Sequence, residues 1–152
     1  MLRIGKLTDY ALLILTQMAK APNAILSATI LAHALHLRTP TVSKVLKMLS
    51  EANLVSSVRG AEGGYHLARK ACDITVADII SAMEGELAMT ECCEKSSHCI
   101  IDSLCTMREN WQQINKLIQS FLAKLTILDM LAPVSVADNR LKRILHEVSD
   151  DK

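Results

Sequence analysis

The sequence predicts a mainly α-helical protein with one small β-hairpin: a winged helix-turn-helix head followed by a long helix. Two short helical segments joined by a tight turn, at about 28–35 and 39–52, predict the helix-turn-helix. A strand, a glycine-rich turn and a second strand follow at 54–69 and predict the wing. Apolar residues then repeat at three- and four-residue steps from Leu104 to Leu131 and predict the long helix.

These patterns divide the chain into four expected units. Residues 1–84 form the winged helix-turn-helix head and residues 85–106 form a cysteine-rich loop. Residues 107–131 form the long helix, and residues 132–152 form a polar C-terminal tail.

The charge is divided unevenly along the chain, although the net charge is only +1. Residues 1–70 carry nine Lys and Arg against three Asp and Glu, whereas residues 71–152 carry eight against thirteen. A basic front half suits a head that binds a polyanion such as DNA. No apolar run approaches the ~18 residues of a membrane span, and no secretory pattern opens the chain. We therefore expect a cytoplasmic protein.

Polar residues mark where the helices of the head begin. Thr8 is expected to cap a first helix over about 9–20, and Ser27 a second helix over 28–35. Thr39 is expected to cap the third helix, with Pro40 at the first helical position, where its missing N–H costs nothing. Thr75 is expected to cap a further helix that ends near residue 83.

The third predicted helix is apolar inside and polar outside. In a helix-turn-helix, the second helix enters the major groove of DNA and its first turns reach base edges. An arginine at the tip of a wing can enter the minor groove. The alternative for each residue is an ordinary solvated side chain. The candidate DNA contacts are Arg38, Thr39, Thr41, Ser43, Lys44, Lys47 and, on the wing, Arg59.

Four of the five cysteines lie within residues 92–105, which argues against a disulfide framework. Cys93, Cys99 and Cys105 are separated by five residues each time, and Cys92 offers a second start. Thiolates that converge on one point can hold an iron–sulfur cluster. The spacing leaves open a zinc site that includes His98, or plain redox thiols. The isolated Cys72 is expected to be a small buried hydrophobe.

The long helix carries an apolar stripe that a small head cannot easily cover, so we expect it to form a homodimer. The alternative is a helix that packs only on its own head. The predicted interface residues are Trp111, Ile114, Leu117, Ile118, Phe121, Leu122 and Leu125.

Enzyme motifs are not found in the sequence. We find no glycine-rich phosphate loop and no cysteine–histidine–acid set, so we expect neither an enzyme nor a small-molecule substrate.

Several of these segments together resemble the Rrf2 family of winged-helix transcription regulators over about residues 1–130. The resemblance rests on Leu7–Ala11, the helix-turn-helix, Leu54–Leu67 with its paired glycines, and the three spaced cysteines. Within the family, Ala88–Cys92 and Asn110-Trp111 are most similar to repressors of SUF iron–sulfur assembly genes.

The resemblance implies a homodimer crossed through the long helix, an iron–sulfur cluster near the dimer interface, and a palindromic double-stranded operator. Cys99 and Cys105 match the second and third cluster ligands of the family. The first ligand is Cys92 or Cys93. Equal spacing favours Cys93, whereas the run Thr90–Cys92 favours Cys92, to which we give a slight preference.

The fourth ligand is where the sequence departs from part of the family. One branch has a histidine three positions after its last cysteine, and here that position is Arg108, whose guanidinium is a poor metal ligand. Another branch uses an aspartate near the amino terminus of the partner subunit, and Asp9 falls on that position. The alternative role of Asp9 is an acid that stabilises the first turn of a helix. His98 is the next candidate, and the cluster type, 2Fe–2S or 4Fe–4S, stays open.

Overall fold

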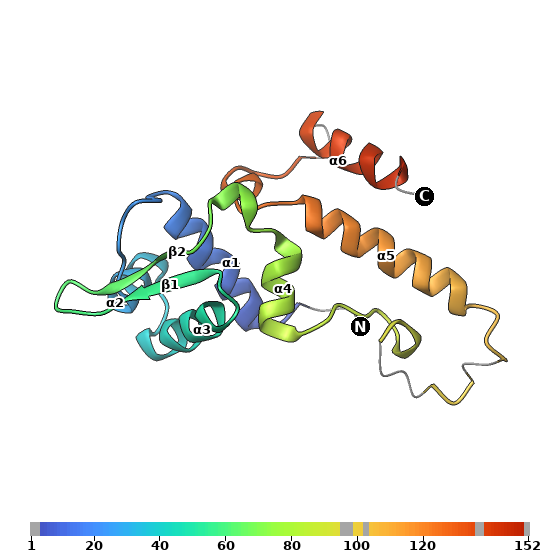
Figure 1. Ribbon diagram of the computed structural model, residues 1–152, viewed down its shortest axis with the longest axis horizontal. Helices are drawn as coiled ribbons and strands as arrows, with labels where there is room; N and C mark the ends of the chain where they lie inside the picture. The colour runs from blue at the N-terminus through green and yellow to red at the C-terminus, as the bar shows by residue number, and fades with distance from the viewer. Residues whose placement is uncertain (1–3, 95–98, 102–103, 136–138, 151–152) are drawn as a thin grey trace.

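Three helices build the core of the head because their apolar residues recur at helical spacing. They are α1 (Lys6–Ala19), α2 (Ala28–Leu35) and α3 (Thr39–Glu51). The computed structural model describes residues 4–94, 99–101, 104–135 and 139–150. In it the three helices pack together at one end of the molecule (Figure 1). Their fully buried side chains include Ile14, Leu15, Leu31, Val45, Leu46 and Leu49.

The helix-turn-helix forms as predicted, with one change at the start of α3. The Ser27 side chain accepts from the Ile30 amide at 3.2 Å, which confirms it as the cap of α2. His36 adopts a left-handed conformation after α2, and this turns the chain toward α3. The predicted cap Thr39 is wrong: Arg38 is the N-cap, and Thr39 already lies within the helix.

The predicted cap of α1 is also wrong. Thr8 lies inside α1 and is fully buried. Its hydroxyl donates to the carboxylate of Glu84, and the same carboxylate accepts from the Gly5 amide at 2.7 Å. An acid 79 residues away therefore satisfies a donor at the start of this helix, where a local cap was expected.

The wing is a two-stranded antiparallel hairpin of β1 (Val55–Val58) and β2 (Gly64–Leu67). Val55 faces Leu67 and Val58 faces Gly64 in the register. Gly64 must be glycine because Leu26 passes so close that a Cβ atom would lie 2.8 Å from its backbone. This contact attaches the wing to the segment before α2, where Leu26 and Tyr65 exchange backbone hydrogen bonds of 2.9 Å.

The helix α4 (Val76–Glu84) starts at a complete capping box, which confirms Thr75 as its cap. The Thr75 side chain accepts from the Asp78 amide, and the Asp78 carboxylate accepts from the Thr75 amide. Cys72 lies just before α4 in the short 3₁₀ helix η1 (Ala71–Asp73) and is exposed. The prediction that Cys72 is buried is therefore wrong, because η1 lies on the surface and turns this side chain outward.

The long helix is shorter than predicted. It is α5 (Arg108–Lys124), and the short 3₁₀ helix η4 (Asp129–Leu131) follows it. At Leu125 and Thr126 the chain leaves the helix and pairs with residues around the start of α4: Val76 N–H donates to Leu125 C=O at 2.8 Å, and Ile127 N–H donates to Ile74 C=O at 2.9 Å. These bonds end the helix and bury Leu125 and Ile127.

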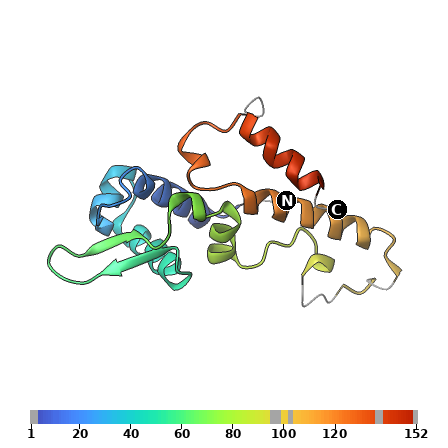
Figure 2. The same ribbon diagram turned by 45° about the horizontal axis from the view of Figure 1, so that its top comes forward.

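The predicted polar tail contains a helix, α6 (Asn139–Asp150). It packs beside α5 (Figures 1 and 2) and buries Leu141, Ile144 and Val148. The Arg140 guanidinium pairs with the Asp129 carboxylate at 2.6 Å. The prediction of a polar tail missed this helix, whose apolar residues, three and four positions apart, form one face. Among the described helices, none is long and apolar enough to cross a membrane.

Candidate functional site

The outer face of α3 is polar and basic. The inward residues Val42, Val45, Leu46 and Leu49 are fully buried, as their spacing predicts. Burial of that stripe turns the other side of the helix to solvent. On α3, Thr41 is half-buried. The other six candidate DNA contacts, on or beside α3 and on the wing, are exposed: Arg38, Thr39, Ser43, Lys44, Lys47 and Arg59.

Arg59 lies on the wing, directly after the last residue of β1. Gly60 follows with a φ of 128°, a conformation that favours glycine and that turns the chain back toward β2. The hairpin extends away from the helices of the head (Figure 1), so Arg59 and α3 present basic groups from two separate elements.

Cys92 and Cys93 lie in a short 3₁₀ helix, η2 (Glu91–Cys93), packed beside α5. The Thr90 hydroxyl oxygen lies 3.1 Å from the Cys92 sulfur and 3.3 Å from the Cys93 sulfur. The Cys93 thiol also donates to the Trp111 carbonyl at 3.5 Å. Both thiols are half-buried.

The other predicted ligands are more dispersed. Cys99 and Cys105 are half-buried, and Cys105 precedes α5, where its carbonyl accepts from the Arg108 amide at 3.4 Å. Asp9 is exposed in the first turn of α1. His98 lies outside the described residues.

The donor chemistry of this segment suits an iron–sulfur cluster. Such clusters are held by thiolates, and Cys92, Cys93, Cys99 and Cys105 are all free cysteines within one short segment. Over the described ranges, however, no three His, Cys, Asp or Glu side chains lie together as a metal site. The structure thus places the four thiols in one segment without gathering them around one point.

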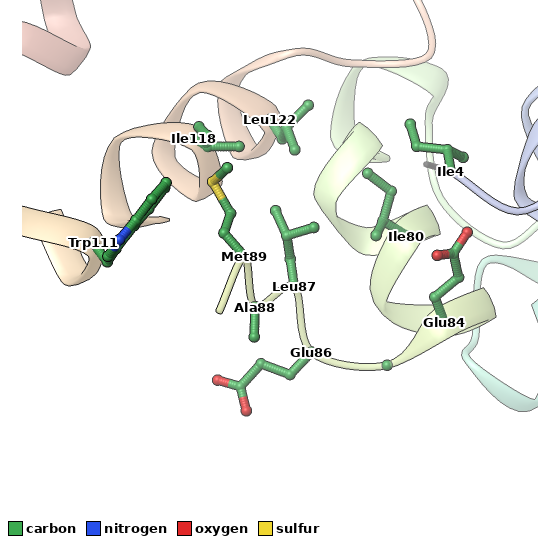
Figure 3. A pocket seen from close by; sticks show the side chains of 11 residues that line it. Ile4, Ile80, Glu84, Glu86, Leu87, Ala88, Met89, Trp111, Ile118 and Leu122 are labelled. Atoms are coloured by element: carbon green, nitrogen blue, oxygen red, sulfur yellow. The ribbon is translucent and has the colours of Figure 1, made fainter. Parts of the chain in front are cut away.

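An open hollow of about 680 Å³ lies beside this segment, between α4 and α5. Its walls are mainly apolar: Met89 and Leu87 face Ile118 and Leu122 (Figure 3). Trp111 closes one end, and Ile4, Ile80 and Glu84 line the other.

The predicted interface residues of α5 fall into three groups. Trp111, Ile114 and Leu117 are 38%, 40% and 47% exposed. Ile118, Phe121 and Leu122 are half-buried. Leu125 is only 8% exposed and packs with Val76 and Ile80 of its own chain, so its assignment to a dimer interface is corrected.

The sequence reasoning overlooked several polar residues beside the cysteines. Gln112, Asn115 and Gln119 lie on one face of α5 and hydrogen-bond the backbone of residues 87–92. Their three- and four-residue spacing was visible in the sequence. The hydrogen bond between Thr8 and Glu84 could not be predicted, because the two residues are far apart in the sequence.

Comparison with known proteins places this architecture in a family. The Rrf2 family, described as "Iron-dependent Transcriptional regulator", matches residues 4–133. The chain belongs to the Rrf2 family. It is 30% identical over 136 residues to the HTH-type transcriptional regulator NsrR of Oceanobacillus iheyensis, an alignment that covers 86% of this chain and 90% of that protein.

Two solved Rrf2-type structures agree with the fold. CymR of B. subtilis, described as the global cysteine regulator of that organism, matches with a TM-score of 0.70 and 28% identity over 89% of this chain and all of that one. IscR of T. potens matches with a TM-score of 0.66 and 30% identity over 86% of each chain. The chain is thus a winged-helix, DNA-binding transcription regulator, and its relatives are regulators and not enzymes.

Proposed function

We propose that this Rrf2 regulator is a homodimer that represses transcription according to the state of an iron–sulfur cluster on its cysteine segment. The observation that carries the proposal is the position of Cys92 and Cys93 beside α5, the helix that also presents the exposed apolar residues Ile114 and Leu117. Because the cysteine segment contacts the proposed dimer helix, a change in the position of one can shift the position of the other.

The DNA interface combines positioning and reading groups. Arg38, Lys44 and Lys47 contact phosphates, Thr39, Thr41 and Ser43 lie toward base edges, and Arg59 enters the minor groove. The exposure of six of these residues, all except the half-buried Thr41, supports this assignment. A dimer binds two half-sites about 34 Å apart, so a small change in the spacing of the heads changes the affinity for the operator.

The cluster ligands are Cys99, Cys105 and one of the pair Cys92 and Cys93, with a preference for Cys92. Asp9 of the second copy is the fourth ligand, and His98 is the alternative. A bound cluster would supply a redox- and oxygen-labile group to the cysteine segment. A coupling of ~1–3 kcal/mol, about 5–150-fold in affinity, is enough for regulation.

The regulated genes are proposed to be those of SUF-type cluster assembly, and the site of action is the cytoplasm. The support is the similarity of Ala88–Cys92 and Asn110-Trp111 to SUF regulators. A repressor that carries a cluster can report directly on the supply of clusters.

A zinc- or thiol-based repressor on the same fold, responsive to redox state or to nitric oxide, is the second candidate. The thiol version is favoured by Cys92 and Cys93, which are adjacent free thiols near the Thr90 hydroxyl. Metal content separates the two candidates.

The deciding experiment is an anaerobic purification of wild type, Cys99→Ala and Cys72→Ala. Cys72→Ala is the matched control because it removes an exposed cysteine outside the segment. We expect brown wild-type and Cys72→Ala proteins that contain iron and acid-labile sulfide, and a colourless Cys99→Ala. Affinities of holo and apo protein are compared on a duplex selected by the wild type from a random pool. Stoichiometric zinc, absence of metal after reconstitution, or equal holo and apo affinities would contradict the cluster sensor.

A further inference from the structure

Three side-chain amides on one face of α5 bind the backbone that leads to the cysteines. Gln112, Asn115 and Gln119 are three and four residues apart, so they share a helix face. Gln119 Nε2 donates to the Leu87 carbonyl at 2.7 Å, and Gln112 Nε2 donates to the Cys92 carbonyl at 3.3 Å. The two ends of the segment 87–92 are therefore both attached to α5.

Asn115 occupies the centre of this arrangement and is only 5% exposed. It is the buried residue of α5, at a position where an aliphatic side chain would ordinarily be expected. Both ends of its amide are used: Nδ2 donates to the Leu87 carbonyl at 3.3 Å, and Oδ1 accepts from the Met89 amide at 3.1 Å. A buried amide is tolerated because it is satisfied, and here its partners are main-chain groups of the segment.

These hydrogen bonds go to main-chain atoms of residues 87–92. They therefore set the register of that segment along α5 independently of the segment's side chains. They hold Cys92 beside the first turns of the helix, where Gln112 lies. Cys105 lies at the same end, because its carbonyl accepts from the amide of Arg108, the first residue of α5. The two ends of the cysteine segment are thereby held at one end of one helix.

We propose that Gln112, Asn115 and Gln119 are positioning residues that fix the register of residues 87–92 on α5 and so keep Cys92 at the end of the helix where Cys105 lies. The role rests on the proposed cluster function, since its purpose is to hold a ligand in place. Release of the segment allows Cys92 to move along α5, and iron and sulfide are then retained less well.

The test compares Gln112→Met and Asn115→Leu with the control Gln113→Met, which replaces an exposed amide on the same helix. Met and Leu approximate the original volumes but lack the amide donor and acceptor.

In the metal-free full-length protein, we expect hydrogen exchange at the Met89 amide to be about five- to tenfold faster in Asn115→Leu, as loss of one hydrogen bond predicts. After anaerobic reconstitution, a chelator should bleach the cluster absorption of Gln112→Met and Asn115→Leu about five- to tenfold faster than that of wild type. Gln113→Met should behave as wild type in both measurements.

Each result decides the proposal. Faster exchange together with faster bleaching, absent from Gln113→Met, supports it. Unchanged exchange at Met89 overturns it, and so does faster exchange with unchanged cluster retention. If Asn115→Leu fails to fold, Gln112→Met at its half-exposed position still decides through the rate of bleaching. A wild-type protein that takes up no cluster overturns the proposed function, and the register is then judged by exchange at Met89 alone.

Discussion

Arg59 is the residue at which the electrostatic contribution of the wing to DNA binding can be measured. It is exposed after β1, on a hairpin that extends from the head. An arginine that neutralises DNA charge releases counterions, so Arg59→Ala should weaken binding and reduce the slope of log K against log salt by ~0.9. The measurement is a gel shift on a random-sequence duplex at several salt concentrations.

Lys142→Ala is the matched control for Arg59→Ala. It removes the same charge from an exposed position on α6, away from the head. Binding and salt slope should be close to wild type. Equal losses in the two variants would mean that only net charge matters and that Arg59 makes no contact.

Local residue chemistry could be predicted from the sequence, and distant partners could not. Ser27 and Thr75 cap their helices as predicted because the bonds they accept come from amides three residues ahead. Thr8 has the same residue chemistry, but its hydroxyl is bound by Glu84, which the fold alone brings near. No window of sequence around Thr8 contains that information.

At the scale of elements, α6 is held to the body by one apolar face and by the ion pairs Arg140–Asp129 and Lys124–Glu147. Its residues Leu141, Ile144 and Val148 are buried, whereas Lys142 and Arg143 are exposed. Ile144→Ala should weaken docking by about 2 kcal/mol, the lower end for loss of a large buried aliphatic side chain. Trypsin, which requires the undocked helix, should then cut within α6 roughly 30-fold faster.

Leu145→Ala is the control for α6 docking, because Leu145 is exposed on the same helix. It should be cut at close to the wild-type rate, with the head still resistant in both variants. If Ile144→Ala were cut no faster than Leu145→Ala, the docking of α6 on α5 would be wrong.

The end of α5 shows why periodicity alone does not set the length of a helix. Leu125 and Leu128 continue the helical spacing, so the sequence predicts a helix to Leu131. The chain instead leaves the helix at Leu125 and pairs with the segment before α4, and Asp129 then accepts from the Thr126 amide at 2.9 Å. This course buries Leu125 and Ile127 but leaves Leu128 exposed, and only the neighbouring segment before α4 decides between it and a continued helix.

At the scale of the whole molecule, each unit has a local signature in the sequence, but the lateral contacts between units do not. The head, the cysteine segment and α5 each carry such a signature. The course of residues 87–92 beside α5 depends on amides that resemble ordinary surface residues in the sequence. For the same reason, the sequence named four thiols without showing how closely the chain gathers them.

The exposed apolar face of α5 predicts which surface joins the two subunits of the proposed homodimer. Ile114 and Leu117 are 40% and 47% exposed, one turn apart, on a helix that extends beyond the head (Figure 2). Two such faces in contact would remove apolar surface from water, so the double change Ile114→Glu and Leu117→Glu should convert a dimer to a monomer in sedimentation equilibrium. Ala123→Glu places a charge on an exposed position on the opposite side of the same helix and should leave the dimer intact. Because a palindromic operator is bound by two linked heads, the monomer should also lose most of its specific affinity while the affinity of each head for random-sequence DNA is kept. A dimer that survives both glutamates would mean that the subunits associate through another surface, and that α5 is not the helix through which the cysteine segment sets the spacing of the heads.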